Sequence, residues 1–438
     1  MVIESSLNRS DPWPARVAIG QTFKHLASSF TPPEVKPFFV FLIKEEALGD
    51  REVDVRRAML DAGTAVIDLH GASSLPGLTS MFETQLSTAS ATETQDQIQE
   101  AVVILFGRLG RHLDPSDPRM PALVERLVEA LKTPAEQVQI AVADCLAPLV
   151  NKMTSPIQQL VDRLLVDLAE VPKYAARRGA AYGLAGVIKG VGIQGIKQYD
   201  VFLRLKGYIE DKKRQEARQG AVMAFETMSA TLTRTFEPYV IHIIPLLLVA
   251  FGDATPEVRE AAQDAARVMM GNMSGYGVKL ILPDLLSGLD EKQWRTKKGS
   301  IELLGMMAYC TPRQLSQSLP IVIPRLTGVL TDSHAQVKSS ANKSLKQFGE
   351  VISNPEIKAL VPVFLKALVD PAKTPNALSA LLKTSFMHYI DLSSLALVRD
   401  WGSPCNAHSW MLPGYSDPRT RSARAWCRDQ AESLSNRW

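Results

Sequence analysis

The fold of this 438-residue chain is decided by the stretch PYVIHIIPLLLVAFGDATPEVREAAQDAARVMM, residues 238–270. Its first half is apolar and carries a proline in what would be the first turn of a helix. In its second half the apolar and small residues Val258, Ala261, Ala262, Ala265 and Val268 recur at i, i+3, i+4, i+7 and i+10. Pro256 stands between the halves and suits the first position of a helix. The pattern predicts two helices joined by a tight turn.

The same pattern recurs along the chain. A basic or polar residue, which we call the anchor, is followed two positions later by a small residue, and the eight anchors are 38–43 residues apart. The anchors are Arg56, Gln99, Gln139, Arg177, Arg218, Arg259, Lys297 and Lys338. The small residues are Ala58, Ala101, Ala141, Gly179, Gly220, Ala261, Gly299 and Ser340. Several anchors follow an aspartate by six or seven positions. A larger side chain at the small position would hold neighbouring helices apart.

A two-helix unit of this length, with an aspartate before the turn and a basic residue after it, is the HEAT pattern. No unit can bury its apolar face alone, so the units must stack. We therefore predict an all-α fold, a right-handed α-solenoid of about nine two-helix units over residues 12–398. Residues 12–30 are expected to form half a unit, and a weaker ninth unit is expected to begin near Asp370. Residues 71–94 are expected to be a longer connector that contains a helix over 78–86.

The last forty residues, 399–438, differ from the repeats. They hold four of the six tryptophans and two of the four cysteines, and they contain no small-residue anchor. A capping repeat should have one polar and one apolar face, and this segment has neither. We expect a poorly ordered tail that stands in place of further repeats. The alternative is a specialised C-terminal binding segment.

Composition excludes several classes of function. Lysine and arginine exceed the acids by three, so there is no global positive field. The cysteines Cys145, Cys310, Cys405 and Cys427 are far apart and form no zinc or disulfide pattern. We expect Cys145 and Cys310 to be small core residues. The most apolar stretch, residues 240–251, is too short to span a bilayer. These features predict a soluble cytoplasmic protein with no membrane partner.

Motifs of catalysis are missing from the sequence. The glycine-rich segment at residues 186–192 has the wrong order for a phosphate-binding loop and is expected to end a helix. The seven histidines are scattered, and no H-E-x-x-H or G-x-S-x-G occurs. We expect a protein that is not an enzyme and that needs no cofactor or metal.

Local charge is more informative than net charge. Residues 171–220 contain eleven basic residues against four acidic ones, and a second basic cluster begins at Lys292. Because the turns recur once per unit, they should align along one edge as a basic stripe suited to phosphate contacts with folded RNA. The candidates are Lys173, Arg177, Arg178, Lys212, Lys213, Arg214, Lys292, Arg295, Lys297 and Lys298. The alternative is that anchors such as Arg218, Arg259 and Lys338 pair with aspartates as a structural ladder, and that other cations are solvated surface groups.

Three segments carry a family resemblance. They are VPKYAARRGAAYGLAGVIKGVGI at 171–193, DKKRQEARQGA at 211–221 and WRTKKGSIELLGMM at 294–307. They resemble the HEAT-repeat translational activator of the general amino-acid control pathway, in the region of that activator that is similar to the HEAT domain of fungal elongation factor 3. The resemblance covers roughly residues 13–398.

The resemblance implies a non-catalytic adaptor that binds the ribosome, through ribosomal RNA or protein. In that family the protein helps to activate the kinase of initiation factor 2 alpha during amino-acid starvation, a stress response, and the elongation-factor-3-like region engages an ABC-type ATPase partner. The kinase-binding segment of the family lies further downstream, and the ATPase cassettes of elongation factor 3 have no counterpart here. The alternative is a HEAT adaptor that binds only proteins, like a transport receptor or a phosphatase scaffold.

Overall fold

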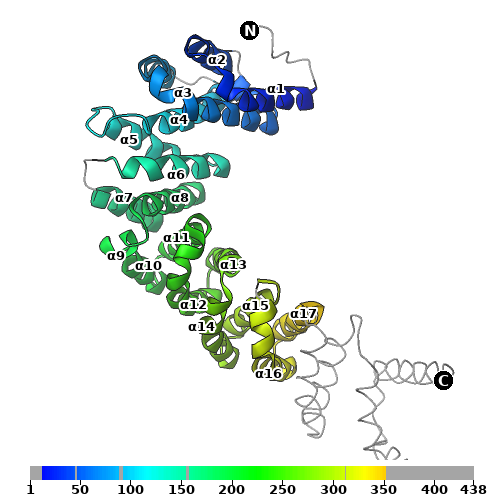
Figure 1. Cartoon of the computed structure of the whole chain (residues 1–438). Helices are drawn as coiled ribbons and strands as arrows, with labels where there is room; N and C mark the ends of the chain where they lie inside the picture. The colour runs from blue at the N-terminus through cyan, green and yellow to red at the C-terminus, as the bar shows by residue number, and fades with distance from the viewer. Residues whose placement is uncertain (1–11, 45–46, 88–91, 154–156, 311, 352–438) are drawn as a thin grey trace, which may run out of the picture. The chain divides into compact units, whose positions relative to one another are not determined.

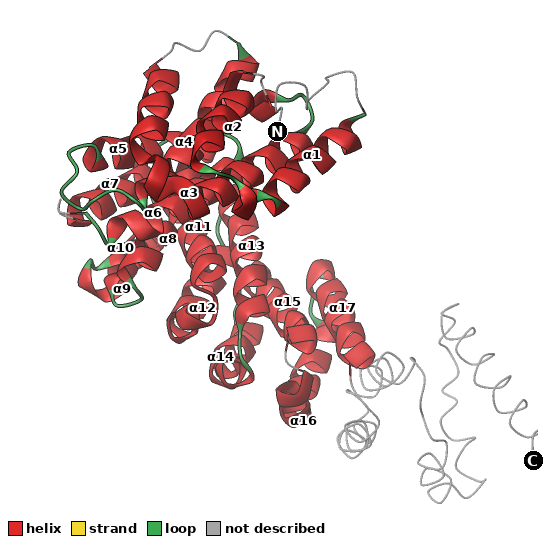
Figure 2. Cartoon of the chain, turned by 45° about the horizontal axis from the view of Figure 1, so that its top comes forward, coloured by secondary structure: helices red, strands yellow, loops and turns green. Residues whose placement is uncertain are grey.

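A computed structural model of the chain describes residues 12–44, 47–87, 92–153, 157–310 and 312–351 (Figure 1). Within these ranges every regular element is helical, as Figure 2 shows. The predicted all-α class is therefore confirmed for this part of the chain. The tail at 399–438, the ninth unit expected near Asp370 and the remaining residues from 352 onward lie outside the described residues.

The second helices of the units pack against one another in chain order (Figure 1). They are α3 (Val53–Ser87), α4 (Glu93–Gly110), α6 (Glu136–Val150), α8 (Tyr174–Val191), α11 (Gln215–Leu232), α13 (Pro256–Asn272), α15 (Trp294–Cys310) and α17 (Ala335–Val351). Each of the eight anchors lies within the first two turns of one of these helices. α1 (Trp13–His25) packs against α3 and so supplies the expected half unit.

The first helices form the other layer of the stack. They are α2 (Pro32–Lys44), α5 (Met120–Ala130), α7 (Ile157–Glu170), α10 (Val201–Glu210), α12 (Glu237–Phe251), α14 (Gly275–Ser287) and α16 (Pro312–Gly328). The short helix α9 (Gly195–Gln198) precedes α10. Most of the 3-10 turns lie between layers, at Ala47–Gly49, Thr233–Phe236, Gly288–Asp290 and Val329–Thr331, and another follows α1 at Ala27–Ser29. Two helices per unit and a repeating stack make this a HEAT solenoid.

Close helix packing explains the small residue of each unit. A Cβ atom added to Gly179 would lie 1.7 Å from the carbonyl oxygen of Leu131, and one added to Gly220 would lie 2.1 Å from that of Leu168. Atoms that are not bonded cannot approach so closely. The requirement for a small residue at these two positions is therefore confirmed.

The connector expected from residue 71 is wrong for residues 71–77, whereas the helix expected over 78–86 is confirmed as part of α3. α3 runs without a break through Pro76 to Ser87 and serves both as the second helix of one unit and as the first helix of the next. The reason is burial: Leu78 and Phe82 are buried. The ring of Phe82 packs edge-on between Phe39 and Phe106, with centroids 5.5 and 6.2 Å away. Residues 88–91 lie outside the described part.

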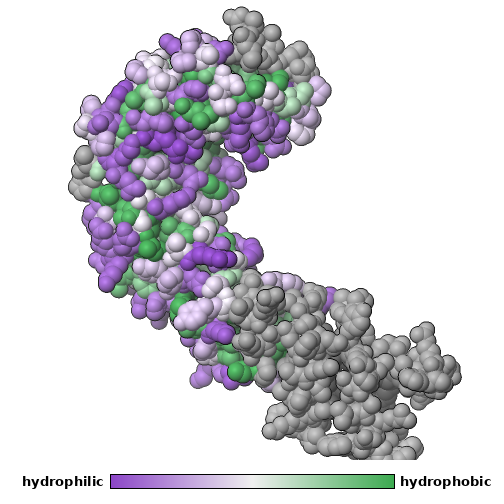
Figure 3. Space-filling model, viewed as in Figure 1, coloured by the Kyte–Doolittle hydropathy of each residue, from purple (hydrophilic) through white to green (hydrophobic). Residues whose placement is uncertain are grey.

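The most apolar stretch lies inside the stack. Residues Gln215–Phe251 have the length and hydropathy of a membrane span. However, Thr233 has a φ of 50°, and α11 and α12 are separate helices on either side of it. In α12 the side chains of Ile243, Ile244 and Leu247 are fully buried. On the face drawn in Figure 3, hydrophilic and hydrophobic side chains alternate in small groups over the described helices.

Candidate nucleic-acid interface

The turns before the second helices contact one another in chain order, and we call this set of turns the turn edge. It comprises residues 171–173, 211–214, 252–255, 291–293 and 332–334. The Arg214 guanidinium lies 3.8 Å from the Glu170 carboxylate of the preceding unit. Further along the chain, Trp294 stacks on His334 of the next turn, with ring centroids 3.8 Å apart and planes inclined by 10°. The predicted alignment of the turns along one edge is therefore confirmed for these units.

Two of the anchor arginines donate hydrogen bonds to backbone carbonyl oxygens of the turn edge. In α8, Nη1 of Arg177 donates to the carbonyl oxygens of Val171 and Pro172, at 2.8 and 2.7 Å. In α13, Arg259 donates in the same way to the carbonyl oxygens of Asp253 and Ala254, both at 2.7 Å. Arg259 therefore binds the backbone of its own turn, not the aspartate carboxylate that the ladder predicted.

Other anchors bind the aspartate of the next unit. Arg218 pairs with Asp253 at 2.6 Å, and Lys297 pairs with Asp332 at 2.8 Å. In the half unit, Arg16 pairs with Asp50 at 2.8 Å, and both side chains are buried. Sequence reasoning missed Arg16 as an anchor, although it lies 40 residues before Arg56 and Ala18 follows it by two positions. The predicted ladder is confirmed for Arg218, and the same geometry holds Lys297.

Arg177, one of the predicted RNA-contact residues, is not an exposed cation, so the structure does not support that role. Its side chain is 7% exposed, and Nη2 donates to Oε1 of Gln219 at 2.5 Å. Burial lowers the pKa of the Arg177 guanidinium. The physical reason is its register on α8, which directs the side chain between the turn carbonyls and α11 rather than outward.

Arg178 is also committed to the protein. Nε donates to Oε1 of Gln139 at 2.9 Å, and Nη2 donates to the carbonyl oxygen of Pro134 at 2.9 Å. Nη1 lies 3.5 Å from the carboxylate of Glu136. Arg178 therefore joins α8 to the preceding unit, and only 19% of its side chain is exposed.

Two cations of the second cluster are paired as well. Lys297 binds Asp332, as described above, and Nζ of Lys298 lies 3.6 Å from Glu302 in the same helix. Arg295 has its guanidinium over the ring of Trp294, 4.7 Å from the centroid. Such contacts leave less of each charge available to a ligand.

Four of the predicted cations remain exposed without an ion-pair partner among the described residues. These are Lys173, Lys212, Lys213 and Lys292. Arg214 is about half exposed and donates to Asp211 at 2.8 Å. Residues 252–255 lie between these turns in the stack, and they contain Asp253 and no basic residue. The predicted continuous stripe is therefore two patches: residues 171–173 with 211–214, which we call the basic turns, and residues 292–295.

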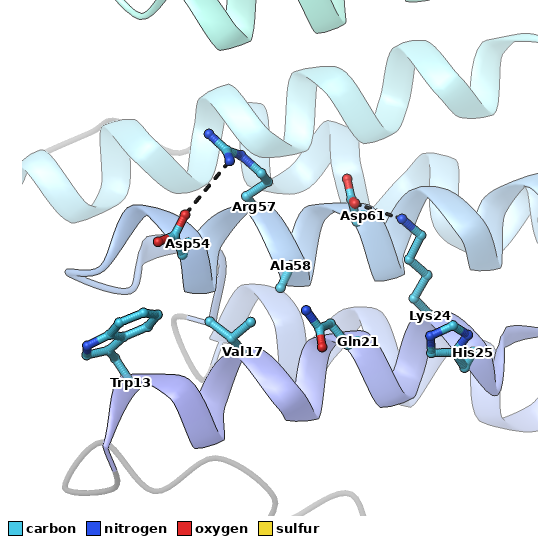
Figure 4. A pocket seen from close by; sticks show the side chains of 9 residues that line it. All are labelled: Trp13, Val17, Gln21, Lys24, His25, Asp54, Arg57, Ala58 and Asp61. Atoms are coloured by element: carbon cyan, nitrogen blue, oxygen red, sulfur yellow. Dashed lines mark hydrogen bonds and ion pairs between the residues drawn. The ribbon is translucent and has the colours of Figure 1, made fainter. Parts of the chain in front are cut away.

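A separate groove of about 660 Å³ lies between α1 and α3 (Figure 4). Lys24 pairs with Asp61 at 2.8 Å across it, and Arg57 lies 3.8 Å from Asp54 on α3. Trp13 stands at one end of the groove and is 47% exposed. Because the two cations are balanced by two acids, the groove has no excess positive charge and does not extend the basic turns.

Cys145, the cysteine whose side chain the structure describes, is buried and therefore unreactive. Cys145 is 3% exposed, and its Sγ lies 3.5 Å from the carbonyl oxygen of Ile104. Burial raises the pKa of the Cys145 thiol to about 12, so the thiolate does not form near neutral pH. Cys145 is the core residue that was predicted, whereas the side chain of Cys310 lies outside the described residues.

Comparison with known proteins shows which families of HEAT repeats this chain resembles. The family of HEAT repeats of the stalled ribosome sensor GCN1 matches residues 2–111, and the EF3 N-terminal HEAT repeat matches residues 177–345. The stalled ribosome sensor GCN1 of Homo sapiens is 47% identical over 389 residues, which is 89% of this chain. This chain belongs to the GCN1 family. The eIF-2-alpha kinase activator GCN1 of Saccharomyces cerevisiae is 43% identical over 403 residues, 91% of this chain.

The match covers only a small part of the GCN1 relatives' own length. The chain spans 14% of the human GCN1 sequence and 15% of the yeast one. Elongation factor 3 of Gonapodya prolifera is 27% identical over 251 residues, which cover 57% of this chain and 23% of that protein. Among solved structures, the karyopherin Kap121p bound to the extreme C-terminus of the phosphatase Cdc14p matches 90% of this chain, with a TM-score of 0.45 and 11% identity. The match spans 42% of the karyopherin chain.

Proposed function

We propose that this chain is a non-catalytic HEAT scaffold of translational control that docks on the ribosome through its basic turns. The observation that carries the proposal is the group of exposed lysines Lys173, Lys212 and Lys213 on two neighbouring turns of a GCN1-family solenoid. Residues 211–214 lie within the region that matches the EF3 N-terminal HEAT repeat, residues 177–345, and residues 171–173 lie just before it. We infer the ribosome as the partner because relatives of this chain are named stalled ribosome sensor.

The chemistry of these lysines suits phosphate groups. An exposed ammonium group without an ion-pair partner keeps its full charge, and contact with a nucleic-acid phosphate releases condensed counterions. Such contacts position a protein without reading sequence. The buried anchors beneath them keep the turns rigid, because Arg177 binds two carbonyl oxygens of the turn that carries Lys173.

The wider role of the family extends this proposal. The yeast relative is named as an activator of the eIF-2-alpha kinase. We place this chain in the same response to amino-acid starvation, in the cytoplasm, where translating ribosomes are. An ABC-type ATPase is the partner that the elongation-factor-3-like region would share. Kinase binding is assigned to no residue of this chain.

Co-sedimentation of the purified chain with ribosomes at low and moderate salt tests the docking. We expect pelleting that weakens with salt and that falls when Lys212 and Lys213 are both changed to glutamate. Arg214 is left unchanged because it is bound to Asp211 within its own turn. The matched control reverses two exposed lysines on first helices, Lys36→Glu with Lys279→Glu, and should pellet like the unchanged chain.

Two results would contradict the proposal. Absence of pelleting at either salt would show that the chain does not dock on ribosomes. If the amount of pelleted chain changed neither with salt nor with charge reversal at Lys212 and Lys213, the chain would dock through another surface. This result is expected for an adaptor that binds only proteins. Circular dichroism of each variant would establish that the array remains folded.

A further inference from the structure

One aromatic ring directly beside the basic turns is half exposed. Tyr174 is the first residue of α8, directly after Lys173, and is 51% exposed. A tyrosine normally buries most of its ring because the ring is largely apolar. The guanidinium carbon of Arg178 lies 5.6 Å from the centroid of this ring. Tyr174 therefore lies over a cation and presents much of its remaining surface to solvent.

The cation beside Tyr174 is held in place by the protein. As described above, Arg178 donates to Gln139 and to the carbonyl oxygen of Pro134, each at 2.9 Å. The turn before Tyr174 is held by Arg177 in the same manner. The guanidinium beside the ring and the turn before it are thus held in place without a ligand, which reduces the entropy lost when a ligand binds.

Two other aromatic rings near the turn edge also contact a guanidinium, but they are less exposed to solvent. The guanidinium of Arg214 lies 5.9 Å from the ring of Tyr208, which is packed partly into the core. Trp294 is also partly buried, and His334 covers it at 3.8 Å. Among the three pairs in the described part of the chain, Tyr174 is the one whose ring is half exposed. Exposed lysines follow in the neighbouring turn, at 212 and 213.

We propose that Tyr174 is a stacking platform for an unpaired base of single-stranded RNA, whose phosphates contact Lys173, Lys212 and Lys213. The proposal rests on the ribosome docking proposed above and names the kind of RNA that the basic turns bind. Every base offers a π face, so stacking on tyrosine is tolerant of sequence. Bases within a duplex are stacked on one another, whereas those of loops and single strands are free to stack on aromatic side chains.

The test measures fluorescence anisotropy of a labelled single-stranded oligouridine with the full chain. We expect Tyr174→Ala to weaken binding about 5- to 150-fold, the effect of removing the stack on one base. Tyr174→Phe keeps the ring and should bind within about twofold of the unchanged chain. Tyr276→Ala removes a tyrosine that is 72% exposed on α14 and should leave binding unchanged.

Salt dependence separates stacking on the ring from phosphate binding by the lysines. Tyr174→Ala should leave the slope of log affinity against log salt unchanged. Lys212→Ala with Lys213→Ala should reduce that slope by about 0.7 for each phosphate that the variant no longer neutralises. A duplex of the same length should bind the unchanged chain and the Tyr174→Ala variant equally.

The proposal would be overturned by equal oligonucleotide binding of the Tyr174→Ala variant and the unchanged chain. If Lys212→Ala with Lys213→Ala still weakened ribosome pelleting in that case, the docking proposal would survive and the stacking proposal alone would fail. If Tyr174→Ala reduced ribosome pelleting while the chain bound no oligonucleotide, the ring would serve a protein ligand, which also overturns the proposal. Conversely, oligonucleotide binding that depends on Tyr174 without ribosome pelleting would support stacking and contradict docking.

Discussion

Arg218 of α11 binds Asp253 in the turn of the next unit with two hydrogen bonds, from Nε to Oδ2 at 2.6 Å and from Nη2 to Oδ1 at 3.1 Å. The same guanidinium donates to the carbonyl oxygen of Asp211 in its own turn, at 2.9 Å. Each of the two charged side chains is 11% exposed. One arginine therefore ties two consecutive turns together, and the neighbouring units share a nearly buried ion pair.

Removing one partner of this pair should destabilise the array. Asp253→Ala leaves the nearly buried guanidinium of Arg218 without its counter-ion, and we expect a loss of about 3 kcal/mol in the free energy of unfolding. Urea denaturation followed by circular dichroism measures it. Asp264→Ala is the control, because its pair with Arg267 is exposed on both sides, and should cost less than about 1 kcal/mol. Equal losses in the two variants would contradict the special role of the pair between units.

Acid should weaken the same contacts. Burial by itself would raise the pKa of the Asp253 carboxyl, but hydrogen bonds from Arg218 and from the Thr255 backbone outweigh it and hold the pKa below the ordinary value. A hydrogen bond from Lys297 lowers the pKa of Asp332. A carboxyl with a lowered pKa in the folded state stabilises the fold above its unfolded pKa, and this stability is lost as the pH falls through the folded pKa. We expect the midpoint temperature of thermal unfolding to decrease as the pH is lowered below about 4. This decrease should be less steep in Asp253→Ala.

Glu226 should show the opposite dependence on pH. Burial, and then the charges of Asp264 and Glu136, raise the pKa of this carboxyl on α11 to about 7, although Arg267 and Arg178 act against them. A raised pKa means that the fold loses stability as the pH rises from the ordinary value of 4.5 through the folded value. Because part of the group is solvated, we expect Glu226→Gln to stabilise the fold by only about 1–2 kcal/mol at pH 8.

The control for Glu226 uses pH and position. At pH 4 the carboxyl is protonated in the folded state and mostly protonated in the unfolded state, so Glu226→Gln should change the stability very little. Glu260→Gln alters an exposed residue of α13 and should have little effect at either pH. If Glu226→Gln changed the free energy of unfolding by the same amount at both pH values, the pKa of this carboxyl would not be raised in the folded state.

Helix spacing makes a further prediction at two glycines. Gly179→Ala places a Cβ against the carbonyl oxygen of Leu131, a backbone atom that cannot move aside, and should cost about 2–3 kcal/mol or more of stability. A Cβ at Gly207 in α10 would meet nothing within 4 Å. Gly207→Ala should instead stabilise the fold by about 0.5–1 kcal/mol, because alanine restricts the unfolded chain. Urea denaturation of both variants compares the two, and a similar sign of effect would contradict the packing seen at Gly179.

The helical units were predictable because their signals are local. The period of the anchors, the small residue after each one and the helical spacing of apolar residues depend only on neighbours within a unit. The start of the expected connector, residues 71–77, was the exception. Its serines, glycines and Pro76 favour a loop locally, but burial of Leu78 and Phe82 between neighbouring aromatic rings outweighs that preference.

The candidate interface was predictable only in part. The turns do lie along one edge, because a constant repeat length brings equivalent residues together. Charge counting, however, treats all cations alike. It did not separate Arg178, which binds three groups of the preceding unit, from Lys212, which has no ion-pair partner among the described residues, and it did not show the gap in positive charge at residues 252–255.

The sequence by itself determined that this protein is a stack of two-helix HEAT units, because the spacing of anchors, small residues and apolar faces is written within each unit. Only the tertiary structure decided which cations face solvent. Arg177 and Lys173 are four residues apart, yet one is buried against α11 and the other is exposed. A long basic side chain takes whichever partner the neighbouring unit offers, and the carbonyl oxygens and carboxylates of that unit are placed only when the units pack.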